Sequence, residues 1–386
     1  MISKTPFYKA HKRENADFTE FAGYDMPVRY DWGNIKDEHR VIRESVGMFD
    51  VSHMGRYWVY GQDAKTYLNY VVPRDIKKLE NGKSGYTFIL NENGGFKDDI
   101  IISQLNNDEF MVVCNAGNRE KIWTWMTEIM EEKIFEGKDV YLEDKSDISS
   151  MLAVQGPESM KTLKKMFGVD IIENRFRTEW YRFENIRVLI STTGYTGENG
   201  VELIIFGDDA DLEHNSLVIW EKLLALNVKP CGLGARDTLR IEAGYHLYGQ
   251  DLSEEIHLLE SGLGFKPLAS IEKESGFKGQ EGVLRGKGIV SRTRVGFKLL
   301  GRGIARYGYP VVDENQLIIG KVTSGTRSPL SDESIGMAYV DKNFNEVGSK
   351  IFVDMKGNRK KSKLVEAEVI GFPTYDTKIY GLNRDE

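Results

Sequence analysis

The C-terminal quarter of the chain limits the choice of folds more than any other part of the sequence. From about Ser291 onward, short runs rich in β-branched residues follow one another with turn residues between them. The runs are "RTRVGFKLL", "YPVVD", "LIIGKVTSG", "SIGMAYV", "SKIFVDM" and "KLVEAEVI". Evenly spaced short strands of this kind are typical of a small β-barrel or sandwich. We therefore expect a C-terminal β domain at residues 289–386.

The residues before this boundary mix strand and helix patterns. "GYTFIL", "DDIIISQL" and "EFMVVCN" are separated by tight turns, which predicts a three-stranded antiparallel meander. "NREKIWTWMTEIMEEK" has the apolar spacing of an amphipathic helix. We therefore expect an α+β body over residues 1–288.

Composition and charge exclude several classes of function. The chain has 386 residues and a formal net charge of −7, which argues against a general nucleic-acid binder because such proteins usually carry a basic excess. The basic run at 356–363 lacks interleaved aromatics and is expected to be a charged hairpin tip. No apolar run approaches the roughly 18 residues of a membrane helix, and the charged N-terminus does not resemble a secretory signal. We expect a cytoplasmic protein in which Cys114 and Cys231 are buried thiols rather than a disulfide.

A metal site is not expected. None of the six histidines pairs with another histidine or with a cysteine at a zinc-binding spacing. The acid pairs at 98–99 and 209–210 do not match the pattern of a calcium loop. Each histidine is therefore expected to be a surface or core residue rather than a metal ligand.

Two adjacent acids, Asp98 and Asp99, follow a glycine pair in "NENGGFKDDII". If this segment is a strand, neighbouring side chains point to opposite faces of the sheet. The two carboxylates then cannot line one pocket together, which argues against a two-metal site and against a two-carboxylate acid–base pair. The pattern favours one working carboxylate at most, and two solvated strand-end residues are the alternative.

The loop "TTGYTGENGVE" gathers three glycines, an aromatic residue and two acids, Glu198 and Glu202. Glycines allow the backbone to approach a ligand closely. A carboxylate can accept two parallel N–H bonds from an amino-heterocycle such as a pterin. The loop is thus a candidate ligand site, and a hairpin turn without a ligand is the alternative explanation.

Eight strings that occur in one order along the chain connect it to a known family. They are "TPFY", "FAGYDMPVRY", "VGMFDVSHMG", "NENGGFKDD", "AVQGP", "TTGYTGENGVE", "KPCGLGARDTLRIEAGYHLYGQDL" and "VTSGTRSP". The chain resembles the T proteins of the glycine cleavage system, which are tetrahydrofolate-dependent aminomethyltransferases. The resemblance implies a three-domain cloverleaf around a central folate site. The body would then consist of two interleaved subdomains, the second at roughly 52–140, followed by a β-barrel.

The resemblance also implies a reaction and its partners. A lipoylated H protein would carry the substrate as an S-aminomethyl group on its lipoyl arm. Tetrahydrofolate, as co-substrate, would take the one-carbon unit, which gives 5,10-methylenetetrahydrofolate, ammonia and the reduced arm. The protein is expected to act as a monomer, without nucleic acid or membrane as a partner.

Site residues are carried over from the family motifs onto this sequence. Asp99 matches the catalytic carboxylate near folate N10, and Asp98 is expected to be its outward-facing, structural neighbour. Arg236 matches an arginine near the site that suits either the glutamate tail of folate or the aspartate. The expected folate-contacting residues are Glu202 at the pterin amino edge, Tyr195 and Tyr86 as aromatic lining, Arg236, and Met54 and Asn115 in the pocket wall.

The chain departs from the family at several positions. Lys97 stands where an aliphatic residue is usual, and strand alternation would place it on the same face as Asp99, where it either pairs with Asp99 or lies outside the cavity. Arg327 stands where aromatics are common, and Arg384 corresponds only loosely to a basic residue that contacts the folate tail.

Related proteins suggest alternative functions for the same fold. The alternatives are a folate-dependent demethylase and a non-catalytic folate-binding regulator. An iron–sulfur assembly role is disfavoured because "SGFKGQEGV" lacks the cysteine of that group's signature.

Overall fold

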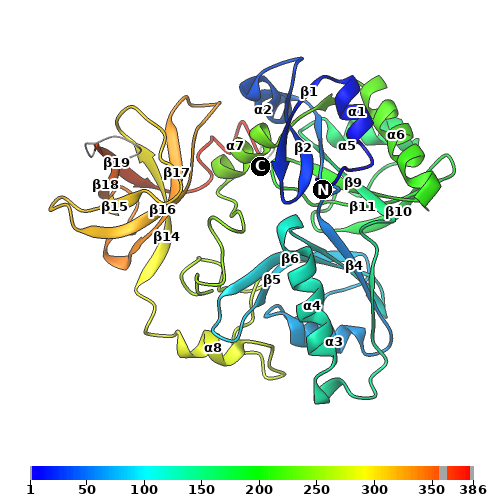
Figure 1. Cartoon of the computed structure of the whole chain (residues 1–386), viewed down its shortest axis with the longest axis horizontal. Helices are drawn as coiled ribbons and strands as arrows, with labels where there is room; N and C mark the ends of the chain where they lie inside the picture. Colours follow the sequence, from blue (N-terminus) through cyan, green and yellow to red (C-terminus); the bar gives the residue numbers. More distant parts are fainter. Residues whose placement is uncertain (1, 208, 356–362, 383–386) are drawn as a thin grey trace.

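Three lobes of the chain surround the centre of the molecule (Figure 1). The computed structural model describes residues 2–207, 209–355 and 363–382. The predicted hairpin tip at 356–362 and Arg384 lie outside the described residues. Two lobes combine helices with largely antiparallel sheets and the third is a barrel, so the predicted α+β fold is confirmed.

The first lobe is built on a six-stranded sheet. Its strands run in the spatial order β10 (Thr178–Phe183), β11 (Ile186–Ser191), β12 (Gly200–Phe206), β9 (Ser149–Gln155), β3 (Gly47–Asp50) and β13 (Lys229–Pro230). Only β13 pairs in parallel, with β3. Because strand side chains alternate between faces, Met48 and Leu152 face one core, whereas Phe49 and Ala153 face another.

Helices cover both faces of this sheet. Residues of α1 (Tyr8–Arg13), α5 (Ser159–Phe167) and α6 (Asp209–Ala225) share a core with Met48 and Leu152. Residues of α2 (Ile35–Glu44) and α7 (Leu233–Ala243) pack on the other face, where Trp58 and Met111 of the second lobe join them. The first and second lobes therefore share one apolar contact.

The second lobe contains a five-stranded antiparallel sheet. Its order is β5 (Lys83–Leu90), β6 (Phe96–Asn106), β7 (Glu109–Cys114), β4 (Gly55–Tyr60) and β8 (Tyr141–Asp144). The predicted meander is confirmed, since β5 pairs with β6 and β6 with β7. The predicted amphipathic helix is α4 (Arg119–Met130), which packs with α3 (Ala64–Val71) on one face of the sheet. Short 3-10 turns lie at Ile76–Lys78, Ala116–Asn118 and Lys133–Phe135.

The path of the chain interlocks these two lobes. Between β3 and β9, which are neighbours in the first sheet, the chain forms the whole second sheet from Gly55 to Asp144. We therefore propose a body of residues 1–288 whose second subdomain, roughly 52–140, is inserted into the first. The chain leaves the first lobe after β3 and returns to it at β9, and these two strands are neighbours in the first sheet. The two connections between the lobes therefore lie side by side.

The third lobe is a closed barrel of the order β14 (Arg292–Leu299), β17 (Ser334–Asp341), β16 (Ile318–Arg327), β15 (Pro310–Val312), β18 (Lys350–Asp354) and β19 (Leu364–Ile370). It confirms the predicted C-terminal β-barrel and contains its own apolar core. A 3-10 turn lies at Lys342–Phe344, and helix α8 (Gln280–Arg285) precedes the barrel. The barrel contacts the body through Ile241 of α7 and Met337 of β17.

After β19 the chain returns from the barrel to the first lobe. The N–H of Thr374 donates to the Glu242 carbonyl at 2.9 Å, and the N–H of Gly381 donates to Glu198 Oε1 at 2.9 Å. The Arg43 guanidinium lies 4.3 Å from the centre of the Tyr375 ring. The segment after the barrel therefore rests on the loop that joins β11 to β12.

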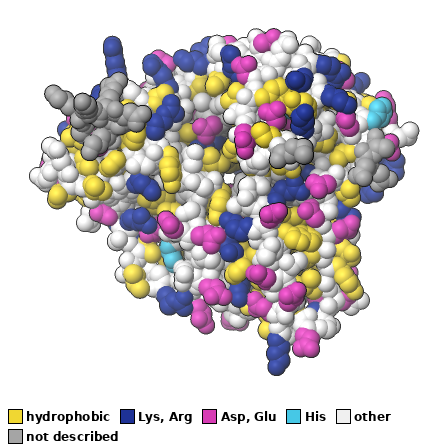
Figure 2. All heavy atoms as spheres, viewed as in Figure 1, with side chains coloured by type: hydrophobic (Ala, Val, Ile, Leu, Met, Phe, Trp, Pro, Cys, Tyr) yellow, Lys and Arg dark blue, Asp and Glu magenta, His cyan; other side chains and the backbone are white. Residues whose placement is uncertain are grey.

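Other predictions about the chain concern its cysteines, its surface and membranes. Cys114 and Cys231 are both buried free thiols. Among the described helices, none combines the length and the apolar character that a membrane crossing requires. Figure 2 shows Lys and Arg side chains interspersed with Asp and Glu side chains on the face drawn there.

Candidate active site

A cavity of about 1050 Å³ lies where the lobes meet. Its wall includes strands β5 and β6, the loop between β11 and β12, helix α7, and the hairpin of β1 (Ala16–Phe21) and β2 (Tyr24–Tyr30). All seven residues that the family motifs select line this cavity, although they come from distant parts of the sequence. They are Met54, Tyr86, Asp99, Asn115, Tyr195, Glu202 and Arg236.

The two adjacent acids of β6 lie on opposite faces of the strand, as alternation predicts. Asp99 lines the cavity, whereas Asp98 does not. The expectation that Asp98 faces outward is wrong, because its side chain is fully buried and accepts hydrogen bonds from residues at the start of α4. The alternative of two solvated strand-end acids is excluded for the same reason.

A β-bulge at Lys97 breaks the alternation just before this pair. Ile89 pairs with Asp98 but Leu90 pairs with Phe96, so Lys97 has no residue opposite it. The Lys97 ammonium lies 3.7 Å from Glu254 Oε2 and 4.1 Å from the ring centre of Trp125 in α4. Lys97 therefore lies outside the cavity, and the prediction that it shares a face with Asp99 fails because of the extra residue.

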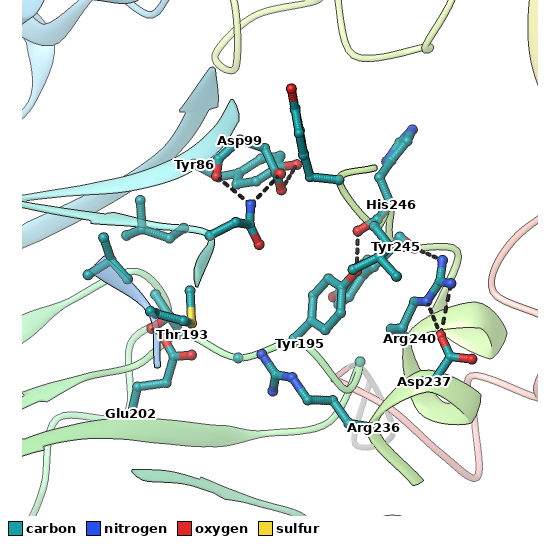
Figure 3. Close-up of a pocket in the computed structure, with 18 of the residues that line it drawn as sticks. Tyr86, Asp99, Thr193, Tyr195, Glu202, Arg236, Asp237, Arg240, Tyr245 and His246 are labelled. Carbon is teal, nitrogen blue, oxygen red and sulfur yellow. Dashed lines mark hydrogen bonds and ion pairs between the residues drawn. The ribbon is translucent and has the colours of Figure 1, made fainter. Parts of the chain in front are cut away.

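Two donors hold the Asp99 carboxylate inside the cavity. The Tyr86 hydroxyl donates to Asp99 Oδ2 at 3.0 Å, and Asn115 Nδ2 donates to Oδ1 at 2.8 Å (Figure 3). Burial raises the pKa of Asp99 to about 6, while these two hydrogen bonds oppose the rise. Asp99 forms no ion pair with a Lys or Arg among the described side chains, so its charge is balanced by neutral donors alone.

Glu202 lies at the opposite side of the cavity in Figure 3. It belongs to β12, where it pairs with Ser191 across the hairpin, and only 8 % of it is exposed. The Thr193 hydroxyl donates a short hydrogen bond to Glu202 Oε2. Burial raises the pKa of Glu202, and both this hydrogen bond and the nearby charge of Arg236 oppose that rise. Glu202, the second carboxylate of the cavity, thus lies near a cation.

Tyr195 and Arg236 form the wall between the two carboxylates. The Tyr195 hydroxyl donates to the His246 carbonyl, and its ring stacks on Tyr245 with ring centres 5.9 Å apart. The Arg236 guanidinium lies 4.9 Å from the centre of the Tyr195 ring, and its buried Nη1 has no hydrogen-bond partner. A buried, unpaired guanidinium nitrogen at a cavity wall is suited to a ligand that accepts a hydrogen bond.

Sequence reasoning missed several side chains that act on the site. Thr193 stands two residues before Tyr195 in the glycine-rich loop, and a hydroxyl in the same loop as the predicted acid Glu202 was the available signal. Asn118 precedes α4, where asparagine usually caps the helix, but its amide donates to Asp98 Oδ1 at 2.6 Å instead. Such long-range uses of a side chain leave no local pattern.

The barrel contributes little to the cavity. Of the barrel strands, only β14 supplies a described lining residue, Arg294. Arg327 forms a bidentate ion pair with Asp332 on the surface, and it is not a lining residue. The departure from the family at Arg327 therefore does not alter the cavity wall.

The described residues contain no group of three or more His, Cys, Asp and Glu side chains arranged to hold a metal ion.

Two family models match the chain in tandem. The GCVT N-terminal domain matches residues 7–266, and the glycine cleavage T-protein C-terminal barrel domain matches residues 292–376. The chain belongs to the glycine cleavage T-protein family. Curated T-protein relatives cover nearly all of it: the aminomethyltransferase of Thermosipho melanesiensis is 42% identical over 96% of both chains. The probable aminomethyltransferase of Pyrococcus horikoshii is 38% identical over 100% of both.

A solved T-protein structure shows the same fold. The crystal structure of glycine cleavage system aminomethyltransferase T from Bartonella henselae superposes with a TM-score of 0.86 at 30% identity. The alignment covers 97% of this chain and 98% of that one. The predicted aminomethyltransferase activity of a glycine cleavage T protein is thereby confirmed.

Proposed function

We propose that the central cavity binds tetrahydrofolate as co-substrate, with its pterin ring at Glu202 and its reactive N5 and N10 nitrogens near Asp99. The observation that supports this most strongly is the placement of two carboxylates, the partly buried Asp99 and the buried Glu202, on opposite sides of one cavity. A pterin presents an amino group and a ring N–H side by side, and a carboxylate accepts both. The Thr193 hydroxyl and the charge of Arg236 favour the ionised form of Glu202, which is the form that accepts both hydrogen bonds.

The lining of the cavity fits the remaining parts of folate. Tyr195, Tyr86 and Met54 offer aromatic and apolar surface to a flat ring system. Arg236 lies beside Glu202, rather than in an ion pair with Asp99. We therefore assign Arg236 to the pterin side of the site, which narrows the choice left open by the sequence.

The one-carbon unit would come from the S-aminomethyl group on the lipoyl arm of an H protein. The carbon–sulfur bond breaks as N5 bonds to the methylene carbon. The carbon–nitrogen bond then breaks as N10 bonds to the same carbon. The protons lost from N5 and N10 leave with the sulfur and with ammonia, so the products are 5,10-methylenetetrahydrofolate, ammonia and the dihydrolipoyl arm.

Asp99 acts in this scheme through its charge. Nitrogen attack on the methylene carbon develops positive charge at N5, and a carboxylate fixed by Tyr86 and Asn115 stabilises that charge without having to reorient. Because Asp99 has no cationic partner among the described side chains, its negative charge is available to neutralise the positive charge that develops at N5 in the transition state. We propose that the protein performs this reaction as a monomer in the cytoplasm.

The test combines the purified protein, tetrahydrofolate and H protein loaded with the aminomethyl group. We expect 5,10-methylenetetrahydrofolate and ammonia to form in equal amounts. Omission of either co-substrate should abolish both products. A folded sample that binds tetrahydrofolate but yields no methylenetetrahydrofolate would overturn the proposal.

A further inference from the structure

Asn115 is bonded to both acids of the adjacent pair at once. Its Nδ2 donates to Asp98 Oδ1 at 2.8 Å and to Asp99 Oδ1 at 2.8 Å, and its backbone N–H donates to Asp98 Oδ2 at 2.9 Å. The carboxamide therefore bridges the buried face of β6 and the cavity face. Of the two acids that the Asn115 amide contacts, Asp99 lines the cavity and Asp98 does not.

We propose that Asp98 is a positioning residue for Asp99 and that it acts through the carboxamide of Asn115. Asp98 anchors both the backbone and the side chain of Asn115, and Asn115 then presents one N–H to Asp99. The inference rests on the proposed function of Asp99 in the transfer reaction. It also reverses the expectation that Asp98 is a structural bystander.

The surroundings of Asp98 contain donors only. Its three hydrogen-bond partners are the backbone N–H of Asn115 and the amide nitrogens of Asn115 and Asn118. Both carboxyl oxygens are therefore required as acceptors, and its side chain is fully buried. An anchor of this kind is rigid because each partner would lose a buried hydrogen bond if it moved.

Charged and titratable groups around the pair come from several elements. They are Tyr86 on β5, Cys114 at the end of β7, Lys121 on α4, Tyr195 on the glycine-rich loop, and Tyr248 and Asp251 after α7. Of these, Tyr86 donates to Asp99, and the other side-chain donor to Asp99 is the neutral amide of Asn115. Burial and the charge of Asp99 raise the pKa of Asp98, and the hydrogen bonds that its carboxylate accepts from Asn115 and Asn118 oppose that rise. The role proposed for Asp98 rests on these hydrogen bonds.

The substitution Asp98→Asn tests the linkage with little change in size. A carboxamide has one oxygen and one NH₂ group, so in either orientation it places a donor against an N–H of Asn115 or Asn118. Asn115 then loses an anchor, and Asp99 loses one of the two donors that lower its pKa. We expect the acid limb of kcat/KM for tetrahydrofolate to move up by about one pH unit. Activity should fall roughly fivefold at pH 6, approach a tenfold loss at about pH 5, and recover above pH 8.

The pH profile of kcat/KM distinguishes the possible effects of the Asp98→Asn substitution. A uniform loss of activity at every pH would mean that Asp98 is merely structural, which overturns the proposal. A limb that moves to lower pH would mean that the variant removed a nearby negative charge, which also overturns it. Inactivity of the wild-type protein would refute the proposed function itself, whereas an unchanged profile in an otherwise active Asp98→Asn protein would refute this inference alone.

A double-mutant cycle tests the route through Asn115. Asn115→Leu alone should produce the same upward shift, and Asp98→Asn added to it should produce no further shift. Two shifts that simply add would show that the residues act independently and would overturn the proposal. If Asp98→Asn does not fold, Asp98→Ser, which keeps one acceptor oxygen in a smaller side chain, replaces it with the same expected direction.

Discussion

The two carboxylates of the cavity, Asp99 and Glu202, both line its wall and both accept a hydrogen bond from a hydroxyl group. They differ in their electrostatic partners. Glu202 lies near the guanidinium of Arg236, whereas Asp99 lies near a second acid and neutral donors. A carboxylate with a cation nearby is suited to hold a neutral polar ligand, and a carboxylate without one is suited to neutralise a charge that appears during the reaction.

This difference divides binding from chemistry within one cavity. Interactions that are equal in the ground and transition states lower KM, whereas those that strengthen only in the transition state raise kcat. We therefore expect substitutions at Glu202 to act mainly on folate affinity and substitutions at Asp99 mainly on turnover. The predictions below test that division.

The largest effect is expected for Asp99→Asn. Removal of the carboxylate should lower kcat by about 10²–10³-fold, because the charge that developed at N5 would lose its stabilising group. The dissociation constant of tetrahydrofolate, measured by titration calorimetry, should change by less than about threefold. Asp108→Asn, at the exposed turn between β6 and β7, is the matched control and should behave as wild type. A large loss of affinity with unchanged kcat would reverse the roles assigned to the two acids.

The next effect is expected for Glu202→Gln. One of the two acceptor oxygens is lost, so the affinity for tetrahydrofolate should fall by roughly 10- to 100-fold, as for a hydrogen bond to a charged group. Turnover at saturating folate should stay within about threefold of wild type. Glu184→Gln, in the exposed turn between β10 and β11, should change neither quantity. A loss of kcat without a loss of folate affinity would contradict the assignment of Glu202 to binding and of Asp99 to turnover.

A smaller effect is expected for Arg236→Met. Without the guanidinium the pKa of Glu202 should rise further, because the nearby positive charge that opposes its rise is gone. Folate affinity at pH 7 should fall by roughly fivefold and should recover as the pH increases and Glu202 ionises. Titrations between pH 6 and 9 measure this. Arg236 would serve Asp99 instead if the variant lost turnover and kept a pH-independent affinity.

The smallest effect is expected for Tyr86→Phe. Asp99 must be ionised to act, and its pKa is raised to about 6, so wild-type kcat/KM should fall as the pH drops through that value. Removal of the Tyr86 hydroxyl raises this pKa again, and the acid limb should move up by roughly half a unit to one unit. Tyr70→Phe, whose hydroxyl bonds Glu132 on a different part of the second lobe, should leave the limb in place. A shift in the opposite direction would contradict the role of the hydroxyl as a donor to the ionised acid.

Local periodicity predicted the separation of Asp98 from Asp99 because strand side chains alternate with a period of two. The same rule failed one residue earlier, at Lys97, since a bulge adds a residue that alternation cannot anticipate. The β character of the barrel was predictable from its repeated short strands, whereas the pairing that closes it, such as that of β14 with β19, joins strands far apart in sequence.

The convergence of the cavity residues could not be derived from the pattern alone. Asp99 and Glu202 are more than one hundred positions apart and lie in different sheets, so the resemblance to a family was needed to select them together. The bridge from Asn115 to both acids depends on how the chain turns after β7, which the sequence did not reveal. The positions of these side chains are decided by tertiary contacts rather than by the secondary-structure propensities of the residues.

The return of the chain from the barrel to the glycine-rich loop has a consequence for how the protein is made. Gly381 donates to Glu198, and Leu382 lines the cavity. These residues leave the ribosome after every described strand and helix, and synthesis adds roughly 5–20 residues each second. The two sheets and the barrel can therefore form while the cavity still lacks part of its wall. Leu382 is therefore the last described part of the cavity wall to be synthesised.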